Sequence, residues 1–209
     1  MNPITSSSLP LIIRLATLDD IPALTALINT SVRTLHAPFY TQAQIEGSLA
    51  SVYGTDTTIV QDGNYFVVTA PSQEKPNAAF PANSKHERII GCGGWSFRST
   101  LYGGDQFSSR DDDNLMNPET DAAKIRALFV HPDFTRRGIG RMILERCEQE
   151  ARKRGFKRAE IGATLAGVDF YRSMGYEVLL EQGVKGFEER ELGNGEVLKL
   201  VRMGRKLDE

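Results

Sequence analysis

The sequence is poor in the residues that mark several classes of protein. Among 209 residues it has two cysteines, one tryptophan and three histidines. Cys92 and Cys147 lack metal-ligand spacing and are too few for a disulfide scaffold, so we expect both to be buried fillers and expect no bound metal. The net charge of −2 argues against a general nucleic-acid binder, which usually has a strongly basic domain.

Long hydrophobic runs are also missing. The opening "MNPITSSSLPLIIRLA" has no basic segment, and its apolar run "LPLII" is too short for a signal peptide or a membrane span. We therefore expect a cytoplasmic protein without a membrane partner. A hydrophobic content of 40% over this length is enough for one sizeable core. This predicts a single domain over 1–209, with a flexible leader at 1–10.

Apolar periodicity divides the first half of the chain into helices and strands. Residues 11–16 form a predicted strand, and 17–36 have apolar residues spaced three and four apart, as in an amphipathic helix. A capping box of Thr41 and Gln44 predicts the start of a second helix. Three β-type runs follow, "TTIVQ", "NYFVVTA" and "RIIGCGGWSF". The "DGN" after the first predicts a hairpin turn, and 71–87, after the second, reads as a long loop.

In the second half of the chain, predicted strands alternate with predicted helices. In "AKIRALFVHP", Ile125, Ala127 and Phe129 alternate with their neighbours, which predicts a strand. A helix with apolar residues spaced four apart follows, then a strand "RAEIGATL" and a short helix in "GVDFYRSM". Two final strands are predicted in "YEVLLEQ" and "EVLKLVRM". The fold class is therefore α/β, in the broad sense that includes α+β.

Arginines crowd the predicted start of the long helix. Arg136, Arg137 and Arg141 lie where the helix dipole is positive, and a cation there costs about 0.3–1 kcal/mol. An anion bound at this point would remove the conflict, and Gly138 and Gly140 would let the backbone approach it. The alternative is that the arginines are solvated and the cost is tolerated. A P-loop is excluded because no Gly-Lys-Ser/Thr is present, and the dinucleotide fingerprint lacks its third glycine.

Four segments in order resemble the long signature of the GCN5-related N-acetyltransferases. These are "LFVHPDF", "TRRGIG" opening a helix, "AEIGAT" and "FYRSMGYE". The resemblance covers nearly the whole chain and implies the family's order, β-α-α-β-β-β-α-β-α-β-β. It also implies a mixed, mostly antiparallel sheet of about seven strands flanked by about four helices. Thr135 departs from the pattern, because the family usually has Arg or Gln there, and this leaves open which arginine reaches the cofactor.

The resemblance implies a site for acyl-CoA, with its pyrophosphate at the start of the long helix. The residues that it assigns to cofactor binding are Leu128, Phe129, Val130, Arg136, Arg137, Gly138, Ile139, Gly140, Arg141 and Tyr171. Tyr171 is also the candidate acid for the departing thiolate, although it could simply be an aromatic packed on the sheet. Glu160 is a candidate base because its strand adjoins the site, although it could equally be a strand carboxylate on the solvent face, and a water chain would also serve as the base.

The predicted function is acyl-CoA-dependent N-acyl transfer. An acetyl group would pass from acetyl-CoA to a primary amine of a small molecule or peptide by direct attack. The alternative is a non-catalytic acyl-CoA sensor, and the weakest reading is another kind of nucleotide-phosphate binder. In this family the first two helices shape the acceptor site, so Arg33, His36 and Tyr40 are candidate acceptor contacts or packing residues. A homodimer is compatible with this interpretation.

Overall fold

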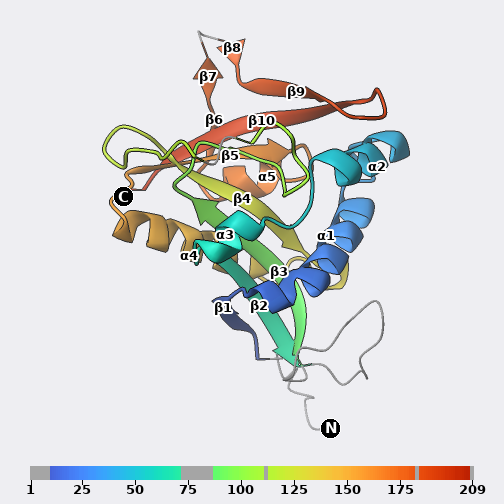
Figure 1. Cartoon of the computed structure of the whole chain (residues 1–209), viewed down its shortest axis with the longest axis horizontal. Coiled ribbons are helices and arrows are strands. Elements are labelled where there is room, and N and C mark those ends of the chain that lie inside the picture. The colour runs from blue at the N-terminus through green and yellow to red at the C-terminus, as the bar shows by residue number, and fades with distance from the viewer. Residues whose placement is uncertain (1–9, 72–86, 111–112, 182–183, 208–209) are drawn as a thin grey trace, which may run out of the picture.

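The fold is one large sheet with helices on both faces (Figure 1). The computed structural model describes residues 10–71, 87–110, 113–181 and 184–207. Its eight-stranded sheet has the order β1-β2-β3-β4-β5-β10-β6, with β9 also paired to β10. The strands are β1 (Ile12–Leu15), β2 (Tyr65–Pro71), β3 (Glu87–Ser96), β4 (Ala123–Val130), β5 (Arg158–Thr164), β6 (Glu177–Val178), β9 (Phe187–Glu191) and β10 (Val197–Lys206); β7 (Leu180–Glu181) and β8 (Val184–Lys185) form a separate pair. Every described pairing is antiparallel except that of β4 with β5.

The helices form a layer on each face of this sheet. They are α1 (Ile21–Leu35), α2 (Gln42–Ser51), α3 (Thr57–Gln61), α4 (Ile139–Lys153) and α5 (Val168–Ser173), with short 3-10 turns at Leu18–Asp20 and Pro132–Phe134. Strand β2 shows the two layers, because Phe66 and Val68 pack in the core cluster of α4 whereas Tyr65 and Val67 pack in that of α1. Within the described ranges, no helix has the length and apolar character needed to cross a bilayer.

Several sequence predictions are confirmed. Helix α1 covers most of the periodic segment 17–36, and α4 covers the long predicted helix. The capping box forms as expected: the Thr41 hydroxyl accepts from the Gln44 N–H at 3.2 Å, and the Gln44 side chain accepts from the Thr41 N–H at 2.9 Å. The mixed, mostly antiparallel sheet also matches the expected fold class. The leader up to residue 9 and segment 72–86 lie outside the described residues.

The predicted strand "TTIVQ" is wrong, because these residues form helix α3. The Asp56 side chain accepts from the Ile59 N–H at 3.2 Å and caps the helix, while Ile59 and Val60 are buried. Gly63 has a φ of +71° just after the helix ends, so "DGN" is a helix-to-strand connection rather than a hairpin turn. A run of five residues is too short for apolar spacing to separate helix from strand.

The C-terminal strands also differ from the prediction. Where one strand was expected over "YEVLLEQ", β6 pairs with β10 and the chain then turns away into β7, which pairs with β8. Strand β9 was not predicted, because three of its five residues are glutamate and none of the usual apolar alternation is present. The other predicted strand, "EVLKLVRM", forms β10.

Candidate active site

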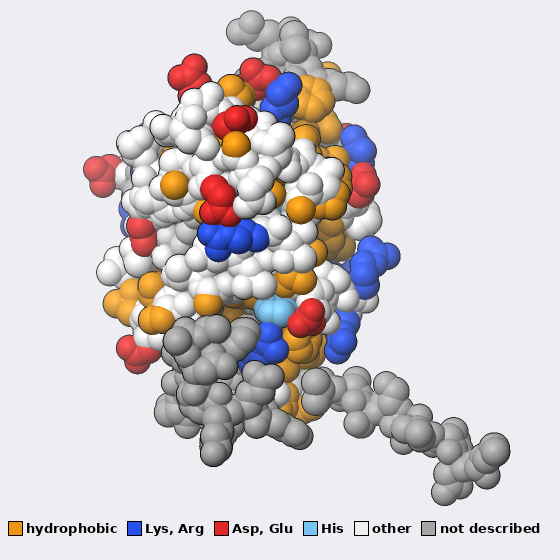
Figure 2. Space-filling view, turned by 90° about the vertical axis from the view of Figure 1, so that its right-hand side faces the viewer, with side chains coloured by type: hydrophobic (Ala, Val, Ile, Leu, Met, Phe, Trp, Pro, Cys, Tyr) orange, Lys and Arg blue, Asp and Glu red, His pale blue; other side chains and the backbone are white. Residues whose placement is uncertain are grey.

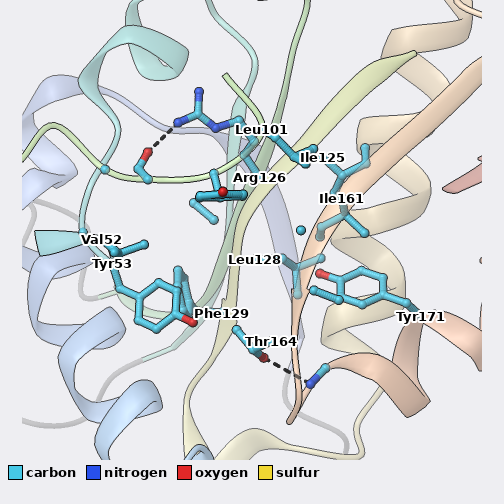
Figure 3. Close-up of a pocket in the computed structure, with 18 of the residues that line it drawn as sticks. Val52, Tyr53, Leu101, Ile125, Arg126, Leu128, Phe129, Ile161, Thr164 and Tyr171 are labelled. Atoms are coloured by element: carbon cyan, nitrogen blue, oxygen red, sulfur yellow. Dashed lines mark hydrogen bonds between the residues drawn. The ribbon is translucent and has the colours of Figure 1, made fainter. Parts of the chain in front are cut away.

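Strands β4 and β5 separate into a wedge near the centre of the sheet. Their parallel pairing joins only Ala123 to Ala159 and Lys124 to Glu160, although β4 continues to Val130 and β5 to Thr164. After Lys124 in β4 and Glu160 in β5, the edges of the two strands that face each other pair with no described strand. Backbone N–H and C=O groups on these edges are therefore available to a ligand that carries amides (Figure 3).

A β-bulge at Ala127 sets the direction of the side chains in the wedge. Cys92 of β3 pairs with Phe129, but Gly94 pairs with Arg126, so β4 holds one extra residue. Ala127 has a φ of +51°, a left-handed conformation that costs roughly 1–2 kcal/mol. The Tyr65 hydroxyl donates to the Ala127 carbonyl at 3.0 Å and helps to hold it.

The bulge also corrects the predicted alternation. Ile125 packs in the core cluster of α4, whereas Ala127 and Phe129 pack on the α1 side, so the three residues do not share a face. Because one extra residue reverses the period of two, Leu128 lies in the cluster of α4 with Ile125.

The start of α4 has a left-handed turn of the kind that suits an anion. The helix begins at Ile139, with Gly138 as its N-cap at a φ of +81°, and Arg136 is also left-handed at +61°. Consecutive N–H groups in such a turn form a concave anion-binding nest, to which the helix dipole adds positive charge. Arg136 and Arg137 thus precede the helix, and of the three predicted arginines only Arg141 lies in its first turn.

The two glycines of this turn serve different purposes. A Cβ added at Gly138 would meet nothing within 4 Å, so there glycine is required by the backbone conformation. A Cβ at Gly140 would lie 3.2 Å from Cζ of Phe170, so there glycine lets α4 approach α5 closely.

A cavity of about 660 Å³ extends from the nest into the wedge. Of the predicted cofactor-binding residues, eight line it: Leu128, Phe129, Val130, Arg136, Gly138, Ile139, Gly140 and Arg141. Arg137, whose guanidinium lies 5.0 Å from the centroid of the Phe134 ring, and Tyr171 do not line it. Among the described residues that line this cavity, none is a carboxylate. The cavity therefore combines a cationic end, suited to phosphates, with strand edges suited to amides.

A second cavity of about 120 Å³ meets the first in the wedge and extends toward the α1 side (Figure 3). Its walls are largely apolar and aromatic, and they include Tyr53, Phe129 and Tyr171. The Tyr171 ring packs edge-on against Phe170 at 5.0 Å and Tyr176 at 5.7 Å. No described residue hydrogen-bonds its hydroxyl, and burial raises the pKa of Tyr171 well above its usual value. Tyr171 is therefore a protonated hydroxyl that lines this cavity.

The structure brings only one of the three predicted acceptor contacts into the site. His36 lines both cavities. Arg33 instead pairs at 2.8 Å with Glu46 on the exposed surface. The Tyr40 hydroxyl donates to the Lys199 carbonyl at 2.7 Å and accepts from the Leu165 N–H at 2.8 Å, so it joins the α1–α2 connection to β10 and the end of β5.

The candidate base Glu160 lies away from Tyr171. It occupies the closed end of the wedge and lines neither cavity. Its carboxylate pairs with Lys124 at 3.0 Å and with Arg202 at 2.9 Å. Burial tends to raise the pKa of Glu160, but these two cations outweigh it and the net pKa is lowered. A carboxylate so paired holds the strands together and is not placed to accept a substrate proton.

Two residues that line the smaller cavity, Tyr53 and Arg126, were not predicted from the sequence. Tyr53 is buried, and its hydroxyl has no partner among the described residues. Arg126 pairs with Asp56 at 2.7 Å, with both side chains almost fully buried. The signal for Arg126 was available, because an arginine inside a strand of apolar residues must find a buried partner. Tyr53 follows α2 and had no such signal.

Surface charge and possible metal ligands bear on whether the described residues form another kind of site. On the face that Figure 2 shows, cationic and anionic side chains are scattered without a continuous basic field. Within the described ranges, no cluster of three or more His, Cys, Asp or Glu residues could hold a metal ion.

Comparison with known proteins decides the family. The sequence model of the acetyltransferase (GNAT) family matches residues 37–176, which contain the nest, the wedge and Tyr171. The chain belongs to the GNAT family. Its residues 128–130, 136–141 and 170–171 therefore lie in the portion that the family shares.

Individual relatives of this GNAT chain are distant. An uncharacterized N-acetyltransferase of Methanocaldococcus jannaschii is 36% identical over 70 residues, which are 32% of this chain and only 30% of that protein. The crystal structure of a GCN5-related N-acetyltransferase from Rhodopseudomonas palustris has a TM-score of 0.62 at 20% identity, covering 95% of this chain and 96% of that one. The PaiA N-acetyltransferase of Thermoplasma acidophilum, in complex with coenzyme A, has a TM-score of 0.54 at 14% identity, covering 94% and 99%. These structures share the fold.

Proposed function

We propose that this GNAT protein transfers an acetyl group from acetyl-CoA to a primary amine of a small molecule or peptide. The observation that carries the proposal is the cavity of about 660 Å³ that joins the nest before α4 to the open edge of β4. One end suits a pyrophosphate and the other suits the amides of a pantetheine arm. The coenzyme A complex of the PaiA structure, which shares this fold, supports the assignment.

The described residues fit this ligand. The left-handed turn at Arg136 and Gly138 would offer backbone N–H groups to the pyrophosphate, and the side chains of Arg136 and Arg141, which line the same cavity, would add charge. The edge of β4 at Leu128, Phe129 and Val130 supplies N–H and C=O groups, and an N–H from Phe129 or Val130 is the candidate donor to the developing oxyanion.

Tyr171 is the proposed acid. When the amine attacks the thioester carbonyl, the C–S bond breaks and the sulfur leaves as a thiolate that gains from a proton donor. The Tyr171 hydroxyl lines the cavity that meets the wedge, and its raised pKa keeps the proton on the oxygen until the thiolate forms.

Two measurements test the proposal. Calorimetric titration with coenzyme A should show binding, and Arg141→Gln should weaken it about tenfold, equivalent to one lost charge-assisted contact. Arg154→Gln is the matched control, since Arg154 caps the opposite end of α4 and should leave affinity unchanged.

The second measurement is thiol release from acetyl-CoA with a broad panel of primary amines. Binding without release for any amine would favour an acyl-CoA sensor instead. Absence of binding would refute the placement of the cofactor altogether.

A further inference from the structure

His36 occupies the junction of the two cavities. It is the C-cap of α1 and is only 6% exposed. Its ring packs edge-on against Tyr53 at 5.5 Å and tilted against Tyr40 at 5.7 Å, which fixes its orientation. The residue lines both the larger cavity, where the acyl-CoA would lie, and the smaller one. His36 shares this position with Leu128, Phe129, Thr164, Gly167 and Phe170, which also line both cavities, and it alone among these six has a titratable side chain.

The imidazole is neutral and available. No described residue hydrogen-bonds either ring nitrogen, and burial lowers the pKa of His36 to about 4. The titratable or charged groups that line the cavities with it are Tyr53, Tyr102, Arg126, Arg136, Arg141 and Tyr171. None of these is a carboxylate that would stabilise an imidazolium. At neutral pH His36 thus presents an unprotonated nitrogen to the cavities.

The remaining described lining groups do not offer an alternative base. Arginine side chains have no hydrogen-bond acceptor, and burial raises the pKa of the tyrosine hydroxyls and keeps them protonated. Glu160, the carboxylate favoured by the sequence, lies outside both cavities.

We propose that His36 is the catalytic base that takes the proton from the acceptor amine. The inference rests on the proposed acyl transfer and assigns the proton acceptor of that reaction. As the amine nitrogen bonds to the acyl carbon, its N–H becomes acidic and the proton passes to a ring nitrogen of His36. The C–S bond then breaks, and the Tyr171 hydroxyl protonates the thiolate.

The proton balance closes after product release. The amide and free coenzyme A leave an imidazolium at His36 and a phenolate at Tyr171. His36 returns its proton to solvent and Tyr171 takes one back, so no oxidant, metal or further reactant is needed.

The test uses hydroxylamine as a probe acceptor, because it is small enough for any amine cavity and largely neutral near pH 7.5. Enzyme-dependent thiol release from acetyl-CoA is measured after subtraction of the uncatalysed reaction. His36→Phe keeps a ring between Tyr40 and Tyr53 and should lower turnover roughly 10²–10⁴-fold, with coenzyme A affinity unchanged. His131→Asn is the matched control: this buried histidine lies outside both cavities, and Asn preserves its N-cap function. Its turnover should change less than threefold.

Chemical rescue separates a base from a packing residue. In His36→Ala, turnover is expressed as a fraction of the wild-type rate at the same pH, which cancels the protonation of hydroxylamine itself. Added imidazole should raise this fraction at pH 8, where imidazole is neutral, and not at pH 5.5, where it is protonated. His131→Ala should show no rescue. If the wild type releases thiol and His36→Phe turns over at the same rate, the assignment of His36 as the base is overturned. The same holds if His36→Ala loses turnover that imidazole does not restore. Neither result affects the proposed function. Absence of enzyme-dependent release in the wild type would overturn the proposed function as well.

Discussion

Replacing Tyr171 by phenylalanine separates its proposed chemical role from packing. The change keeps the ring and its edge-on contacts with Phe170 and Tyr176, and it removes a hydroxyl that no described residue hydrogen-bonds. The free energy of unfolding should therefore change by less than about 1 kcal/mol, since no protein hydrogen bond is lost. If the hydroxyl protonates the thiolate, turnover should fall roughly 10²–10⁴-fold, or about 2.7–5.4 kcal/mol in activation free energy.

The pH profile gives a second readout for Tyr171. The acid must be protonated to act, and burial raises its pKa, so it stays active at a pH where an exposed tyrosine would ionise. The wild type should show no alkaline loss of turnover attributable to Tyr171 up to about pH 10. Single-turnover thiol release and thermal unfolding of both proteins are the assays. Unchanged single-turnover rates in Tyr171→Phe would refute the acid assignment and leave packing as its role.

Four further substitutions probe the nest, the two ends of α4 and the closed end of the wedge. Gly138→Ala should destabilise the protein by about 1–2 kcal/mol in thermal or urea unfolding, because its φ of +81° is left-handed, and should weaken coenzyme A in calorimetry; unchanged values of both would contradict the nest. Arg141→Gln should raise the stability of the ligand-free protein by about 0.3–1 kcal/mol and Arg154→Gln should lower it, since they lie at opposite ends of the α4 dipole; shifts of the same sign would refute this reasoning. Glu160→Gln should leave thiol release within threefold. Because the folded-state pKa of Glu160 is lowered, its stabilisation exists above the unfolded-state pKa and is lost as pH falls through the folded value. The variant should therefore lose less stability on acidification than the wild type, as measured by urea titrations.

The sequence determined the elements that local rules fix. Helix α1 follows from its apolar spacing, and α2 from the reciprocal hydrogen bonds of Thr41 and Gln44. The unusual arginines before α4 pointed to an anion, and the segments around them indicated the family that the comparison confirmed. Local signals succeed here because each depends on residues within one or two turns of one another.

Only the tertiary structure decided which side chains meet. One extra residue in β4 at Ala127 reverses the alternation of the strand, and sequence alternation alone does not show where a bulge falls. The separation of β4 from β5 after Lys124 puts Glu160 at the closed end, although its strand borders the site. His36 reaches both cavities because α1 packs across β4, whereas Tyr40, four residues later, is held by β10. These outcomes depend on packing between segments that are distant along the chain, from the 36 residues between Lys124 and Glu160 to the 159 between Tyr40 and Lys199, which local spacing does not encode.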